Sequence, residues 1–100
     1  AAEVSYFFGE AARIEHLEHV AYYEKQRPGL GARYLAAFET AMVSICEHPD
    51  RFRVDHAPGI RRFRVAGFPY SILYRQSGRD IEVLVVAPHR RRPDYWVGRR

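Results

Sequence analysis

The chain has 100 residues, 47% hydrophobic and 28% charged, which predicts one globular domain over residues 1–100 and excludes chain-wide disorder. It contains no run of about 18 apolar residues, which argues against a membrane span, and its N-terminus lacks the pattern of a signal peptide. The single cysteine, Cys46, has no partner for an internal disulfide, so we expect a reducing, cytoplasmic location.

The charge is divided unequally between the two halves of the chain. Residues 1–50 carry four basic and eight acidic side chains, a balance of −4, whereas residues 51–100 carry twelve arginines and four acids, a balance of +8. Because arginine binds phosphates and carboxylates through paired hydrogen bonds, the basic half suggests an anionic partner, either a nucleic acid or an acidic protein segment. A basic surface that only keeps the protein soluble is the alternative.

The N-terminal half predicts a short strand followed by a helix. Residues 4–8 are aromatic and β-prone, and residues 10–26 then repeat apolar groups at helical spacing. The histidines of this helix, His16 and His19, are spaced as metal ligands can be, but no Cys or His cluster accompanies them, so we assign them to a solvated face. The core-facing stripe is expected to contain Ala11, Ile14, Leu17, Val20 and Ala21.

A second helix is predicted from about residue 30 to residue 47, between the helix-breaking Arg27-Pro28-Gly29 and His48-Pro49. Two helices of similar length with a short connection favour an antiparallel hairpin. Cys46 is interpreted as a core residue that widens the apolar stripe of this helix. The stripe itself is expected to contain Leu30, Tyr34, Phe38, Met42 and Ile45.

The C-terminal half predicts three strands after a loop at residues 49–59. From Ile60 the apolar period changes to two, and residues 70–75 and 81–87 form two further strands separated by turns that contain glycine. Connections this short require antiparallel neighbours. The expected fold is therefore α+β, with element order β-α-α-β-β-β and a helical hairpin packed on an antiparallel sheet.

Two arginines share one face of the first of these three strands. Arg62 and Arg64 alternate with apolar residues, so they either form a positive surface or pair with Glu82 across the sheet. We favour the positive surface, because the acids in this half of the chain are too few to neutralise it.

Five stretches of the sequence together point to one family of proteins. They are Ala21-Tyr22-Tyr23, His48-Pro49, Gly59 to Phe63, Phe68 to Arg75 and His89 to Trp96, the last two being the most specific. With the element order, they make essentially the whole chain resemble the RelE/ParE superfamily of bacterial toxins from toxin–antitoxin pairs.

The resemblance implies a partner and an activity. The usual partner is an antitoxin encoded by a neighbouring gene, and the activity is growth inhibition. RelE-type members enter the ribosome and cleave mRNA, whereas ParE-type members have no nuclease activity and poison DNA gyrase. The resemblance implies no cofactor, metal or membrane, and operator DNA would be bound only through the antitoxin.

The RelE-type reaction needs cations for the phosphate and groups that move protons. One arginine of the RelE pattern, on the second strand of the sheet hairpin, is replaced here by Ser71. Losing one such charge commonly costs about 100-fold in rate, so the resemblance favours the ParE branch. If the chain were a nuclease, its catalytic residues would be Arg62, Arg64, Arg90, His89 and Tyr95.

The favoured interpretation is a ParE-like growth inhibitor that acts on DNA gyrase, and the ribosome with mRNA is the alternative target. A second alternative is a non-toxic relic that only binds its antitoxin. Trp96 is interpreted as either a core residue or a contact residue. The residues predicted to bind the target are Arg90, Arg91, Arg92, Tyr95 and Trp96.

The antitoxin is expected to cover the arginine-bearing surface with an acidic and apolar segment that becomes ordered on binding. Because contacts between arginine and carboxylate would carry part of the affinity, binding should weaken with salt. The residues predicted to contact the antitoxin are Arg62, Arg64, Arg75, Tyr22 and Tyr34.

Overall fold

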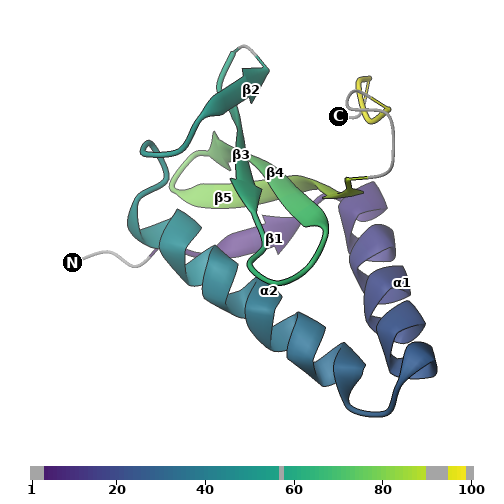
Figure 1. Ribbon diagram of the computed structural model, residues 1–100. Coiled ribbons are helices and arrows are strands. Elements are labelled where there is room, and N and C mark those ends of the chain that lie inside the picture. The colour runs from purple at the N-terminus through teal and green to yellow at the C-terminus, as the bar shows by residue number, and fades with distance from the viewer. Residues whose placement is uncertain (1–3, 57, 90–94, 99–100) are drawn as a thin grey trace.

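The computed structural model describes residues 4–56, 58–89 and 95–98. Its five strands form one sheet in the spatial order β1-β5-β4-β3-β2, and two helices joined by a short turn pack on it (Figure 1). The elements in chain order are β1 (Tyr6–Phe8), α1 (Glu10–Gln26), α2 (Leu30–Glu47), β2 (Val54–His56), β3 (Ile60–Arg64), β4 (Tyr70–Ser77) and β5 (Asp80–Pro88).

The predicted α+β fold is confirmed, with two differences in the sheet. The segment predicted to be a loop contains β2, a three-residue strand at the sheet edge that pairs antiparallel to β3. In addition, β1 pairs with β5 in parallel, with Tyr6 opposite Ile81, whereas β3, β4 and β5 are antiparallel neighbours as predicted. The parallel pair is possible because the helical hairpin and three strands separate β1 from β5 along the chain.

A carboxylate of α1 explains where α2 begins. Gly29 lies in the left-handed region with a φ of 88°, and the Glu24 carboxylate accepts hydrogen bonds from the backbone N–H groups of Gly29 and Gly31. Glu24 thereby satisfies N–H groups at the helix start that lack a partner within the helix. Gly31 also lets the helices approach closely, because a Cβ atom there would lie 2.8 Å from the Val20 carbonyl oxygen.

The apolar stripe predicted for α2 is largely confirmed. Leu30 and Cys46 are only half-buried at its margins, and Cys46 packs against the core as expected. The core between the helices and the sheet combines the buried residues of α2 (Tyr34, Phe38, Met42 and Ile45) with sheet residues such as Ile72, Tyr74, Val83 and Val86.

The apolar stripe predicted for α1 is wrong. Ile14 and Leu17 are 47% and 54% exposed, Ala11 and Ala21 are also exposed, and only Val20 of the predicted set packs against the core. The helix is therefore rotated relative to the prediction, with its most apolar side chains facing solvent.

The inward face of α1 is built around the histidines that were assigned to solvent. The ring of His16 is buried, with its centroid 4.3 Å from that of Phe38 and 5.0 Å from that of Phe8. The ring of His19 lies 4.2 Å from that of Tyr70. The flat imidazole rings thus pack against aromatic rings of β1, α2 and β4. The predicted stripe missed them because histidine was counted as a polar residue.

The sheet face opposite the helical core carries a smaller apolar cluster. Trp96, which follows β5 in a short turn, packs into it. Neither helix of the described chain is long and apolar enough to span a bilayer. The buried members of this second cluster are Leu73, Leu84, Val85, Ala87 and Trp96.

Candidate functional site

The strand register brings most of the predicted cationic side chains onto one face of the sheet. Arg62 and Arg64 lie opposite Leu73 and Ser71 of β4, and since side chains alternate along a strand, both arginines project away from the helical core. Further along β4 the side chain of Arg75 joins Glu82 of β5. We call the sheet face that carries Arg62, Arg64 and Arg75 the arginine face.

A hydrogen-bonded serine and histidine lie beside these arginines. Ser71 is buried, and its Oγ lies 2.9 Å from Nε2 of His89, the residue that follows β5. The backbone N–H of His89 donates to the carbonyl oxygen of Pro69, which fixes the histidine over the end of the strand. Partial burial, followed by the charges of Arg64 and Arg62, lowers the pKa of His89. The neutral imidazole can then exchange a hydrogen bond with the Ser71 hydroxyl in either direction.

Two of the three cations on the arginine face are already paired. The Nε of Arg62 lies 3.0 Å from Oδ1 of Asp55, and the Nε of Arg75 lies 3.0 Å from Oε1 of Glu82. Glu82 therefore forms its ion pair with Arg75 and not with Arg62. Arg64 is exposed and has no acidic partner within the described part of the chain, so it is the cation most accessible to a ligand.

The aromatic pair that follows β5 is anchored to the protein itself. The Tyr95 hydroxyl donates to Oε2 of Glu15 in α1 at 2.8 Å. Trp96 is only 4% exposed and meets the His56 ring edge-on, with centroids 4.9 Å apart. Of the two interpretations of Trp96, the structure supports the core residue, and its predicted contact with a target is wrong in this conformation.

Glu15 also completes the exposed edge of β5, a role that the sequence analysis missed. β1 stops alongside Val83, so the next part of β5 has no strand on that side in the part of the chain that the structure describes. There the Val86 N–H donates to Oε1 of Glu15, and Nε2–H of His19 donates to the Val86 carbonyl oxygen. Acidic and imidazole side chains four residues apart on a helix lie on one face, but nothing in the sequence showed which strand they meet.

The residues predicted to contact the antitoxin differ in how far they are exposed. Tyr22 is exposed on α1, and Arg62, Arg64 and Arg75 lie on the arginine face. Tyr34 is completely buried in the aromatic core, and burial raises the pKa of its hydroxyl. The predicted contact of Tyr34 with the antitoxin is therefore wrong. The predicted target contacts Arg90, Arg91 and Arg92 lie outside the described residues.

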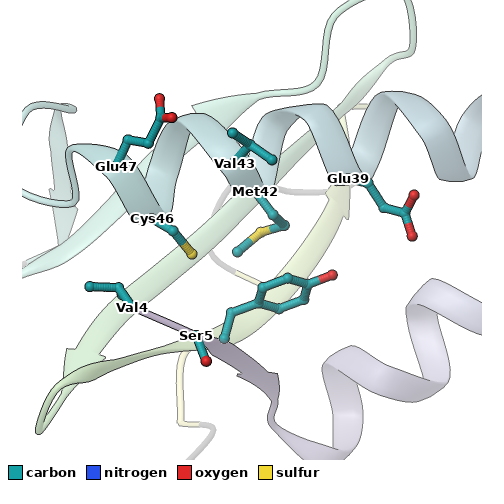
Figure 2. A pocket seen from close by; sticks show the side chains of 8 residues that line it. Val4, Ser5, Glu39, Met42, Val43, Cys46 and Glu47 are labelled. Atoms are coloured by element: carbon teal, nitrogen blue, oxygen red, sulfur yellow. The ribbon is translucent and has the colours of Figure 1, made fainter. Parts of the chain in front are cut away.

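The structure has a groove between β1 and α2 that was not predicted from the sequence. It lies between the N-terminal end of β1 and α2, with a volume of about 760 Å³, and Figure 2 shows Val4 facing Cys46 across it. Within the described residues there is no group of three or more His, Cys, Asp or Glu side chains placed to bind a metal. The groove, called the edge groove below, is lined by Val4, Ser5, Tyr6, Glu39, Met42, Val43, Cys46 and Glu47.

Comparison with known proteins shows the family of the chain through its sequence and confirms the fold through a solved structure. Residues 6–93 match the family described as "ParE toxin of type II toxin-antitoxin system, parDE". The chain is 39% identical over 66 residues to a protein of Sinorhizobium fredii that is named "Putative toxin Y4kP", covering 66% of this chain and 68% of that protein. A solved structure titled "Chromosomal ParDE TA system from P. aeruginosa" superposes with a TM-score of 0.74 at 16% identity, covering 86% of this chain and 96% of that one, which confirms the fold.

Proposed function

Since this chain belongs to the ParE toxin family of type II toxin–antitoxin systems, we propose that it inhibits growth by binding DNA gyrase in the cytoplasm and is neutralised by a cognate antitoxin. The family assignment supports a toxin. The gyrase target and the antitoxin are the parts that the proposal adds.

The observation that carries the gyrase proposal is the side chain at position 71. Where a RelE-type nuclease is expected to present an arginine to the scissile phosphate, this chain has a buried serine that is hydrogen-bonded to His89. Because Arg62 is paired with Asp55, Arg64 is the accessible cation of the arginine face among the described residues. One accessible cation is too few to stabilise the charge of a phosphorane-like transition state. Inhibition by binding needs no such set of preorganised cations.

The experiment is a supercoiling and DNA-cleavage assay with purified gyrase and the full chain. We expect loss of supercoiling and accumulation of cleaved DNA. Arg91→Glu, at a predicted target contact, should reduce the effect, whereas Arg79→Glu, in the exposed turn between β4 and β5, should not. Unchanged supercoiling and cleavage at saturating protein would overturn the gyrase proposal.

A second candidate function is supported by the Ser71–His89 pair. His89 is the group best placed to move a proton beside Arg62 and Arg64, and its lowered pKa keeps it neutral near pH 7. Cleavage of ribosome-bound mRNA that disappears in His89→Gln would establish this RelE-like activity. If the chain affects neither gyrase nor mRNA and its overexpression without antitoxin is harmless, a non-toxic relic is the remaining interpretation.

A further inference from the structure

Within residues 4–56, 58–89 and 95–98, β1 is an edge strand with no strand on its outer side. β1 is the first strand in the spatial order, and among the described residues it pairs with β5 alone. The Ser5 carbonyl oxygen accepts from the Ile81 N–H, and the Gly9 N–H donates to the Val83 carbonyl oxygen, so both residues point toward β5. Because successive residues alternate, the N–H and C=O groups of Tyr6 point away from the sheet. An extended segment could pair with them.

The edge groove lies directly beside this open strand. Val4 and Tyr6 form its wall on the β1 side, and Met42 and Val43 form the wall on α2. Val43 is 56% exposed, the highest value among the large apolar residues that are exposed in the described chain, and it lies in the last five residues of α2. An apolar side chain from an added strand would therefore find apolar partners on both walls.

Carboxylates stand at both ends of the groove in a protein whose net charge is +4. Glu39 and Glu47 are exposed on α2, and neither has a basic partner within the described residues. Figure 2 shows their side chains at opposite ends of the groove-lining part of α2, with Met42 and Val43 between them. The negative charge of Glu39 also contributes to a raised pKa of the Tyr6 hydroxyl, after the larger effect of burial.

We propose that the edge groove binds an extended peptide segment that adds a strand to β1 and carries basic residues on both sides of an apolar one. The distance along the helix axis fits this chemistry. Glu39 and Glu47 are eight helical residues apart, about 12 Å along the axis, and residues i and i+4 of a strand are about 13 Å apart on one face. Basic residues at i and i+4 would meet the two carboxylates while the apolar residue at i+2 enters the groove.

This surface is distinct from the arginine face in position and in charge. The arginine face recruits acidic groups, whereas the edge groove selects basic ones, so one acidic segment cannot satisfy both. The proposal concerns the sheet edge and is independent of whether the chain acts on gyrase, because binding to the groove is measured without any target.

The test uses the ¹⁵N-labelled full chain and the acetylated, amidated peptide Ser-Lys-Thr-Leu-Thr-Lys-Ser. We expect saturable binding with the largest amide shifts at Tyr6 and its neighbours in β1. Glu39→Lys should weaken binding about 5-fold, the size of one partly screened ion pair. Glu18→Lys makes the same charge change on the exposed side of α1 and should alter affinity by less than about 2-fold.

Three results would overturn the proposal. One is a peptide with Glu in place of both Lys that binds as tightly as the basic peptide. Another is binding that is equally affected by the two charge reversals, because this would reflect net charge alone. The third is a chain that dimerises without peptide and loses dimerisation in Glu39→Lys, since the groove would then be an interface between copies of this chain.

Discussion

At the residue scale, Glu15 takes the place of a strand neighbour where β1 ends. Its two carboxylate oxygens accept from the Val86 N–H and the Tyr95 hydroxyl. Val86 is completely buried, so Glu15→Ala leaves its N–H without an acceptor. We expect the free energy of unfolding to fall by about 1–3 kcal/mol. Urea denaturation measures this change, and amide hydrogen exchange at Val86 should accelerate.

Glu18→Ala is the matched control for this substitution. Glu18 lies on the exposed side of the same helix, so its removal should change the unfolding free energy by less than about 0.5 kcal/mol. Equal stability of the two alanine variants would show that the Glu15 contacts contribute nothing measurable.

The buried His16 makes stability depend on pH. Burial, followed by the nearby His19, lowers the pKa of His16 in the folded state, and Nδ1 of its ring is buried with no hydrogen-bond partner among the described residues. The unfolded chain therefore binds a proton at a higher pH than the folded chain. Stability from this site is fully present above the unfolded pKa of about 6.5 and is lost as the pH falls below it.

The expected result is a decrease in unfolding free energy between pH 7 and pH 5 that becomes smaller in His16→Phe. Phenylalanine keeps a flat ring between Phe8 and Phe38 but cannot bind a proton. Urea denaturation at both pH values measures the difference, and His48→Gln, at an exposed position, serves as the control. A pH dependence that is the same in His16→Phe and in the parent chain would contradict this role of His16.

At the element scale, α2 and the three-stranded meander were predictable because their burial follows simple periods. Tyr34 and Phe38 repeat at helical spacing, and β5 is apolar on both faces because both faces are covered. α1 was not predictable in this way, since it has apolar residues on two sides. The aromatic contacts of His16 decide which side faces the core. β2 was missed because its strand is short and its partner, β3, sets its pairing.

The close packing of the two helices predicts that a glycine-to-alanine substitution in α2 lowers the free energy of unfolding. Replacing glycine by alanine inside a helix normally stabilises it by up to about 1 kcal/mol. For Gly31→Ala we expect the opposite, a loss of about 1–3 kcal/mol, because the new methyl group meets the Val20 carbonyl oxygen and the Glu24 side chain. Thermal or urea unfolding decides the sign, and Ala32→Gly, at an exposed position one residue on, shows the ordinary propensity effect.

At the scale of the whole molecule, the sequence predicted the positions of the arginines better than it predicted which of them form ion pairs. Strand alternation was enough to place Arg62 and Arg64 on one sheet face. Their ion pairs were not visible, because Asp55 reaches Arg62 only through the pairing of β2 with β3. The edge groove could not be predicted either, since it depends on the pairing of β1 with β5, which lies far away in the sequence. Local periods therefore predict surfaces, while long-range pairing decides which surfaces remain available.

This distinction gives the last prediction, which concerns the cognate antitoxin. Because Arg62 and Arg75 are already paired, the electrostatic part of antitoxin binding should depend chiefly on Arg64 among the described cations of the arginine face. We expect affinity to fall about 10-fold or more between 50 and 500 mM salt. Arg64→Glu should weaken binding about 5-fold at low salt and make it less salt-dependent. Titration calorimetry with the antitoxin measures both effects, and Arg79→Glu provides a charge-matched comparison. If Arg79→Glu weakened binding as much as Arg64→Glu, net charge rather than the arginine face would govern antitoxin recognition.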